Sequence, residues 1–211
     1  MSTAHTAAVS VSENDSAQEL ARAELYGLLA ELWLAAPTTE QLGRFKTAVT
    51  QAPQPGAFLE DPWQRLVAAL RNTDADAARA EYGALFHGVG RPEIFLYGSH
   101  HLSGSLNDRP LAALRADLLA LGLQRDDARG ETEDHVSFVF EVMRFLIAGD
   151  DAAVCNLTQQ RRFFRTHVQT WVGSLCDATL AHPRAQVWHA VAAFTAAYVE
   201  VEAQGFDFIE D

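Results

Sequence analysis

The stretch Gly130–Gly149 reads GETEDHVSFVFEVMRFLIAG, in which a polar start rich in acids leads directly into a strongly apolar run. Thr132 is a favourable N-cap residue, and Glu133 and Asp134 would then fall in the first turn, where the positive end of the helix dipole favours acids. The same dipole disfavours a cation, so it does not explain His135. The stretch therefore predicts a helix that begins after Thr132, with His135 beside Asp134 as a polar pair at its start.

The rest of the chain follows the same helical spacing of apolar residues, and no alternating strand pattern competes with it. The expected breaks between helices are Pro37, Pro53–Gly56, Gly88 with Gly90, Gly122 and Pro183. The expected starts are Thr38, Asp61, Thr73 and Asn107–Asp108, and the residues expected to be buried in the last helix are Val187, Val191, Phe194, Tyr198 and Val199. We therefore predict an all-α, single-domain bundle of about eight to ten helices. This domain should span residues 16–205, with tails at 1–15 and 206–211.

Composition narrows the class of protein. The chain has 211 residues, 48% of them apolar, which is enough for one folded domain with a substantial core. Its 16 basic and 28 acidic residues give a net charge of −12, which disfavours nucleic acid as a partner and favours basic partners. Cys155 and Cys176 are isolated and fit buried thiols of a reducing compartment. Neither a signal peptide nor a spanning run of about 18 apolar residues is recognisable, so we expect a cytoplasmic protein without stable membrane insertion.

Familiar catalytic and metal-binding patterns do not fit the sequence. No histidine follows a glutamate by three positions, as a di-iron bundle needs, and the zinc-protease pattern HExxH is absent. His100 and His101 are neighbours that would point about 100° apart on a helix, so we do not expect them to share an ion. Asp134 and His135 could form a general acid–base pair, but no nucleophile is recognisable beside them. We therefore predict no metal, cofactor or catalytic residue, and an enzyme is the weaker class.

Residues 87–106 read HGVGRPEIFLYGSHHLSGSL and are expected to form a long connection between helices. Four apolar residues follow one another in it, from Ile94 to Tyr97, and long loops in compact domains are often functional. One interpretation places the loop under the bundle. The other makes it the lining of a groove that accepts an apolar segment of another chain.

Three segments resemble the TorD/DmsD/NarJ family of redox-enzyme maturation chaperones, most closely its TorD branch. Glu131–His135 is similar to the family's E-P-x-D-H motif, Leu96–Leu102 to its P-x-x-S-x-Y-L loop, and Phe163–Trp171 to a later F-x-x-H-x-x-P-W pattern. Their order and separation fit the family, and together with the helical layout the resemblance covers roughly residues 20–200.

The segments also depart from the family's pattern. Thr132, Leu96 and Thr170 stand where the family has proline, and His101 stands where it has tyrosine. Thr132 keeps the cap chemistry but removes a rigid entry to the helix. These departures affect the shape of the loop, and hence ligand preference, and they are compatible with members associated with formate dehydrogenase operons.

The resemblance implies a cytoplasmic chaperone that binds the twin-arginine leader of the apo catalytic subunit of a molybdenum enzyme and delays export until the cofactor is inserted. Glu131, Glu133 and Asp134 would select the arginines of the leader, whereas burial of its apolar segment would supply most of the affinity. The further peptide-binding candidates are His135, Tyr97, Ser99 and Leu96. Asp134 and His135 also have a purely structural interpretation, in which they hydrogen-bond the loop to the helix start.

Two alternatives of another class stay open. A helical enzyme that uses Asp134 and His135 would need a closed polar pocket and turnover. A permanent structural subunit of an oxidoreductase complex would co-purify with its partner and show no preference for paired arginines. The client, and the choice between a monomer and a dimer that exchanges helices about the loop 122–130, stay open too.

Overall fold

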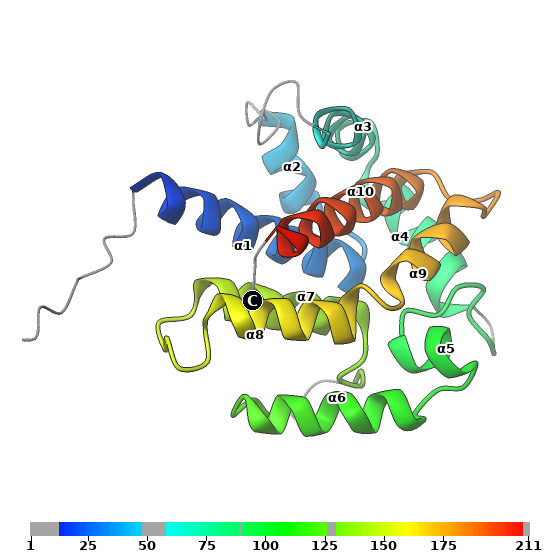
Figure 1. Ribbon diagram of the computed structural model, residues 1–211. Helices are drawn as coiled ribbons and strands as arrows, with labels where there is room; N and C mark the ends of the chain where they lie inside the picture. Colours follow the sequence, from blue (N-terminus) through cyan, green and yellow to red (C-terminus); the bar gives the residue numbers. More distant parts are fainter. Residues whose placement is uncertain (1–12, 48–57, 89, 126–129, 209–211) are drawn as a thin grey trace, which may run out of the picture.

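The computed structural model describes residues 13–47, 58–88, 90–125 and 130–208. Over these residues the chain forms ten α-helices and no strand, so the predicted all-α fold is confirmed (Figure 1). The helices are α1 (Glu13–Leu34), α2 (Thr39–Thr47), α3 (Glu60–Arg71), α4 (Ala75–Tyr82), α5 (Gly98–Ser103), α6 (Arg109–Ala120), α7 (Val136–Ala148), α8 (Leu157–Phe163), α9 (Val172–Leu180) and α10 (Val187–Asp207). Two π-helical turns, Gly83–His87 and Phe164–Val168, continue α4 and α8. The predicted break at Pro53–Gly56 and part of the loop 122–130 lie outside the described residues.

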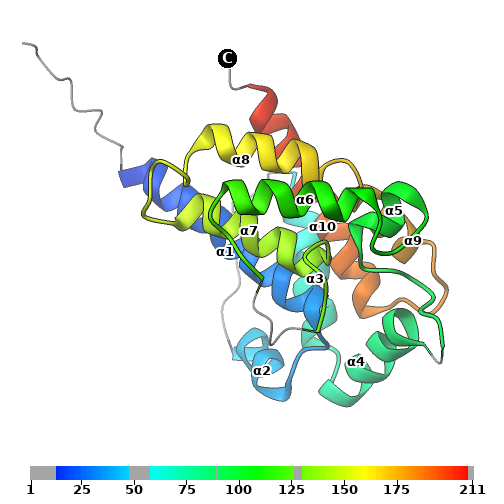
Figure 2. The ribbon, with the colours of Figure 1, turned by 90° about the horizontal axis from the view of Figure 1, so that it is seen from below.

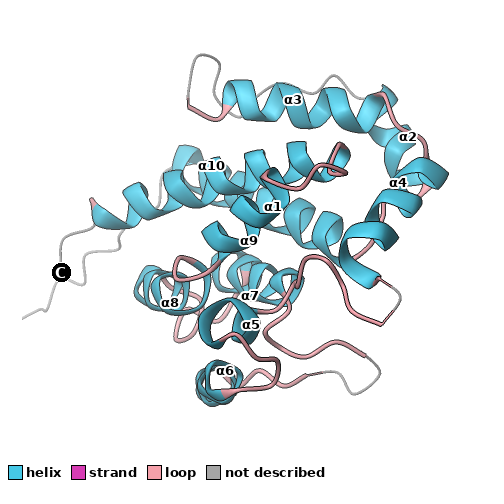
Figure 3. Ribbon diagram, turned by 90° about the vertical axis from the view of Figure 1, so that its right-hand side faces the viewer, coloured by secondary structure: helices cyan, strands magenta, loops and turns pink. Residues whose placement is uncertain are grey.

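The helices are arranged in successive tiers. Figures 1 and 3 show α3 at one side, α10 and α1 next to it, α7 and α8 beyond them, and α6 at the far side. Helix α1 makes its most extensive contacts with α7, and α10 packs mainly against α9 and α3. The apolar stretch that dominates the sequence, now α7, therefore lies against α1 in the middle of the molecule.

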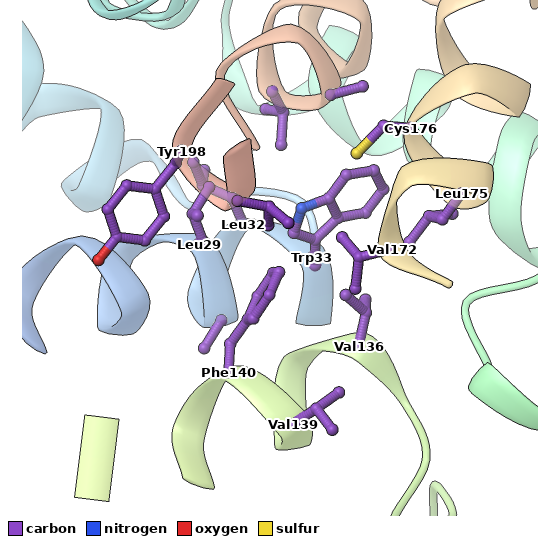
Figure 4. Packing of buried hydrophobic residues seen from close by; sticks show 14 of the residues in the cluster. Leu29, Leu32, Trp33, Val136, Val139, Phe140, Val172, Leu175, Cys176 and Tyr198 are labelled. Atoms are coloured by element: carbon purple, nitrogen blue, oxygen red, sulfur yellow. The ribbon is translucent and has the colours of Figure 1, made fainter. Parts of the chain in front are cut away.

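The core forms where apolar faces of α1, α7, α9 and α10 meet. Trp33 of α1 lies between Val136 of α7 and Cys176 of α9 (Figure 4). Its indole N–H donates to Thr195 Oγ1 at 3.0 Å, which satisfies the one polar atom of a buried ring. The residues predicted to be buried in the last helix, Val187, Val191, Phe194, Tyr198 and Val199, are all buried in α10. The helical period alone was enough to identify this inward face.

Most predicted helix ends agree with the structure to within one or two residues. Asp108 caps α6, and Gly122 follows this helix with a φ of 72°, in the left-handed region that glycine adopts freely. Asp74, not the predicted Thr73, caps α4, because its carboxylate accepts two backbone N–H groups of the first turn.

Helix α10 has well-anchored ends. It continues through Asp207, beyond the predicted start of the C-terminal tail at residue 206, because Phe206 is buried with its ring centroid 5.1 Å from that of Phe164. At its start, the Glu81 carboxylate accepts the N–H groups of Gln186, Val187 and Trp188 at 2.8, 3.1 and 2.9 Å. A carboxylate from α4 therefore takes the place of a local cap. At the other end of the chain, α1 begins at Glu13, inside the predicted tail 1–15.

The connection 87–106 is shorter than expected because Gly98–Ser103 forms α5, which ends at Gly104 with a φ of 79°. The prediction of one long irregular loop is therefore wrong. Ile94 and Leu96 are buried in the main core, so the first interpretation of this segment, a loop placed under the bundle, is confirmed for these two residues.

Candidate functional site

The first signature segment, Glu131–His135, forms a turn before α7. Helix α7 begins directly after His135, which is its N-cap: His135 Nδ1 accepts the N–H of Ser137 at 3.2 Å. Thr132 instead donates its hydroxyl to Asp134 Oδ1 at 2.6 Å. The prediction that Thr132 caps the helix is therefore wrong, because the neighbouring carboxylate competes for its hydroxyl.

The turn is bonded to the second segment, Leu96–Leu102. Asp134 Oδ2 accepts the N–H of Ser99 at 2.8 Å, and the backbone oxygen of Asp134 accepts the N–H of Gly98, also at 2.8 Å. Leu96 extends this attachment, because its backbone oxygen accepts the N–H of Val136 at 2.9 Å. The side chain and the backbone of Asp134 together therefore fix the start of α5 beside the start of α7.

Tyr97 joins the same two segments through its ring. Tyr97 and His135 pair in an isolated antiparallel bridge, and their rings meet edge-on with centroids 5.2 Å apart. The Tyr97 hydroxyl donates to the Glu131 carboxylate. Both Tyr97 and Glu131 are half-buried, so this pair lies at the edge of the junction.

The third segment, Phe163–Trp171, closes the junction. Its His167 and Trp171 line a cavity of about 20 Å³ together with Gly98, Ser99 and Asp134. A Cβ atom at Gly98 would lie 3.0 Å from the Trp171 ring, so glycine allows α5 to approach this closely. The three segments that carry the family resemblance therefore meet at one buried place, and the cavity between them is too small for a substrate.

His100 and His101, whose role the sequence leaves open, hold α5 against its neighbours. The His100 ring stacks on Phe95 with centroids 3.9 Å apart, and the His101 ring stacks on Trp171 at 5.6 Å. His101 Nε2 also lies 2.7 Å from the backbone oxygen of Phe95. Their rings point to different partners, as expected for neighbours on a helix.

The pH dependence of stability tests the cap at His135. Burial lowers the pKa of His135 to about 4, although Glu131 and Asp134 oppose this shift. An unfolded histidine titrates near 6.5, so the unfolded chain binds more protons between pH 6.5 and 4. The contribution of His135 is therefore complete above pH 6.5 and is lost as the pH falls through this window, by about 3 kcal/mol. Urea unfolding followed by tryptophan fluorescence at pH 7, 5.5 and 4.5 measures it.

The variant His135→Asn provides the control. Asparagine is a good N-cap residue, so it keeps an acceptor for the Ser137 N–H but does not titrate. The free energy of unfolding of this variant should fall less between pH 7 and 4.5 than that of the wild type, by about 2.5 kcal/mol. Parallel pH profiles for the two proteins would show that His135 does not titrate as its burial predicts.

A groove of about 480 Å³ lies next to this junction and is lined by residues of α1, the C-terminal end of α6 and α7. Figure 2 shows these three helices from the side of α6. Its apolar lining comes from Leu34, Leu118, Leu123, Phe138, Val142 and Phe145. A volume of this size is typical of sites that bind small molecules or several side chains of a peptide. The groove is therefore the place where this face of the molecule can accept an apolar segment of another chain.

Charged side chains of both signs line the groove. Its acids are Glu31, Glu133 and Glu141, and its bases are Arg125 and Arg144. Burial raises the pKa of Glu133, but hydrogen bonds from Arg115 and the backbone, together with the positive charges of Arg115 and Arg125, outweigh it and hold the pKa below its ordinary value. Glu133 thus stays ionised at neutral pH although it is mostly covered.

The structure divides the seven predicted peptide-binding residues into two groups. Glu133 lines the groove, and Glu131 and Tyr97 are half-buried beside it in the same turn and junction. The other four are buried in the junction, namely Asp134, His135, Ser99 and Leu96. Asp134 and His135 are only 3% and 2% exposed, and the Asp134 carboxylate is engaged by Ser99 and Thr132.

The sequence interpretation missed the apolar lining that α7 supplies. Phe138, Val142 and Phe145 follow one another at intervals of four and three residues, so they share one face of the helix. Val139, Phe140 and Met143 form another face, which is buried in the core. The available signal was a wide apolar arc, interrupted in α7 only by Ser137, Glu141 and Arg144, because a single packing partner such as α1 covers only part of such an arc.

In the part of the chain that the structure describes, no group of three or more His, Cys, Asp or Glu side chains is placed to hold a metal ion. Among the same residues, no helix combines the length and the apolar composition that a membrane span requires.

Comparison with known proteins points to one family. The model of the nitrate reductase delta subunit family matches residues 53–177, more than half of the chain. The matched region contains all three signature segments and the helices α6 and α7 that line the groove. A search of curated proteins finds no match.

Proposed function

Because the chain belongs to the nitrate reductase delta subunit family, which comprises non-catalytic chaperones of molybdoenzyme maturation, we propose that it binds the twin-arginine leader of its client in the groove between α1, α6 and α7. Bound there, the leader would be kept from export until the cofactor is inserted. The family match does not specify the TorD branch, so membership of that branch stays a prediction.

The groove supports this proposal because its chemistry resembles that of a leader, which carries two arginines followed by an apolar segment. Six large apolar side chains line it, and Glu31, Glu133 and Glu141 lie along the same surface. Burial of about 400 Å² of apolar leader surface is worth about 10 kcal/mol before association costs of similar size. An exposed ion pair contributes about 1 kcal/mol or less. We therefore expect apolar contacts to supply most of the affinity and the acids to supply selectivity.

The signature segments would support leader binding by holding the groove residue Glu133 in place. The Asp134 junction holds the turn 131–135 in place, and this turn presents Glu133 to the groove. We propose that Asp134, His135, Ser99 and Leu96 act through this placement, whereas Glu131, Glu133 and Tyr97 are accessible enough to contact the leader.

The proposal also covers which enzyme is the client and in which compartment the chaperone acts. The departures at Leu96, His101, Thr132 and Thr170 fit a formate dehydrogenase as the client. A chaperone that acts before export works in the cytoplasm. Either a monomer or a dimer that exchanges helices could bind the leader there. The competing hypothesis, a permanent subunit of the enzyme complex, predicts the chaperone in the purified oxidoreductase and equal binding of leaders with and without paired arginines.

Titration calorimetry with synthetic leaders from neighbouring oxidoreductase genes tests the proposal. Phe145→Ser should weaken leader binding by about tenfold or more, because a phenylalanine that lines the groove no longer contributes burial. Leu157→Ser is the matched control: Leu157 is 42% exposed, against 39% for Phe145, but lies on α8 and does not line the groove. It should change the affinity by less than about twofold.

Two results would contradict the proposal. One is equal weakening by Phe145→Ser and Leu157→Ser, which would place the leader elsewhere. The other is the absence of measurable binding for every leader, with the protein folded by circular dichroism. A leader in which Lys-Lys replaces Arg-Arg should bind more weakly than the natural one, by a smaller factor than the loss of Phe145.

A further inference from the structure

Two of the three groove acids already hold an arginine of this chain. Arg115 of α6 donates Nε and Nη2 to Glu133 Oε2 at 3.0 and 2.8 Å. Arg144 of α7 donates Nε to Glu141 Oε2 at 2.9 Å and lies within 2.8 Å of the same oxygen through Nη2. Both arginines are about half exposed, at 51% and 52%, whereas Glu133 is 13% and Glu141 40% exposed. Arg115 is therefore more exposed than the acid it holds, and both members of the Arg144–Glu141 pair are open to solvent, so another cation can reach either pair.

The position of Arg144 is built into the helix that faces it. Gly27 lies in the middle of α1, and a Cβ atom there would be 2.9 Å from Arg144 Cδ. Glycine in a helix interior costs about 1 kcal/mol relative to alanine, so its presence needs a reason. Glycine at this position leaves room for the Arg144 stem, which lies directly against the α1 backbone at the edge of the groove.

We propose that Arg115 and Arg144 occupy, in the peptide-free protein, the two carboxylates that the paired arginines of the leader take up on binding. The inference rests on the proposed function and adds a mechanism of selection to it. Binding then exchanges two internal ion pairs for two intermolecular ones, so the net electrostatic gain is small. The exchange also selects arginine over lysine, since a lysine ammonium does not reproduce the planar fork of a guanidinium on a carboxylate.

This exchange predicts that removing an internal arginine strengthens binding. Arg115→Gln and Arg144→Gln should each raise the affinity for an Arg-Arg leader by about three- to tenfold, because the leader no longer competes with them. Arg79→Gln is the matched control: it removes the same charge from an exposed pair with Asp76 on α4, away from the groove. Its effect should be below about twofold.

A double-variant cycle separates pair exchange from general charge. In a Glu133→Gln background, Arg115→Gln should give no gain, because there is no carboxylate left to release. The contrast between Arg-Arg and Lys-Lys leaders should also become smaller when Glu133 is replaced. Circular dichroism of each variant checks that helix content is unchanged.

The possible outcomes distinguish this inference from the proposed function. If the wild type binds an Arg-Arg leader and Arg115→Gln and Arg144→Gln behave like Arg79→Gln, the exchange mechanism is overturned and the proposed function stands. If neither the wild type nor the variants bind any leader, both are overturned. A gain in affinity that persists in the Glu133→Gln background also overturns the exchange at Glu133.

Discussion

Replacing Glu202 by alanine is expected to lower the free energy of unfolding by about 3–4 kcal/mol. Arg22 of α1 donates Nε and Nη2 to the two carboxylate oxygens of this buried residue of α10, at 2.9 and 2.8 Å. The Tyr26 hydroxyl donates to Glu202 Oε2 at 3.1 Å. The alanine variant removes the acceptor that these donors share, and covered donors without an acceptor are costly.

Urea unfolding followed by tryptophan fluorescence measures this loss. Glu200→Ala is the control, because Glu200 is an exposed acid two residues away on the same helix and should change stability by less than about 0.5 kcal/mol. The double variant Arg22→Met/Glu202→Met should recover most of the loss, since apolar side chains of similar length need no partner. Equal stabilities of Glu202→Ala and Glu200→Ala would contradict the interpretation of the pair as a buried link between the first and last helices.

Replacing Asp134 by alanine should cost about 3–4 kcal/mol as well, because its carboxylate accepts the Ser99 N–H and the Thr132 hydroxyl in a buried junction. Asp134→Asn should cost only about 1 kcal/mol, since the amide oxygen can keep the Ser99 N–H while the Thr132 hydroxyl rotates to accept from the amide group. Thermal unfolding of both variants measures the difference.

Asp134→Asn also separates the two roles of this residue. The variant removes the charge but keeps the shape, so a positioning residue should leave the affinity for the leader within about twofold of the wild type. Asp134→Ala, in contrast, should weaken leader binding together with stability, because the turn that carries Glu133 loses its anchor. A folded Asp134→Asn protein that no longer binds the leader would show instead that the carboxylate contacts the arginines directly.

The site was only partly predictable from the sequence. The resemblance located all three signature segments, and one of the peptide-binding candidates, Glu133, lines the groove. The cap prediction failed at Thr132 because its hydroxyl donates to Asp134, a carboxylate that the distant Ser99 holds in place. The local sequence patterns also left Phe138 and Val142 of α7 unassigned, since the apolar arc of that helix is wide and the sequence does not say which part of it stays uncovered.

The sequence by itself determined the helical class, the inward face of α10 and the family, because each depends on residue types at short, regular spacing. Only the tertiary structure decided how the charges are paired and where the groove opens. Arg22 meets Glu202 because the first and last helices lie beside each other, and Arg115 of α6 meets Glu133 because the turn 131–135 lies beside that helix. Contacts of this kind depend on the angle and register of packed helices, which the summed fit of many core side chains sets and no local pattern encodes.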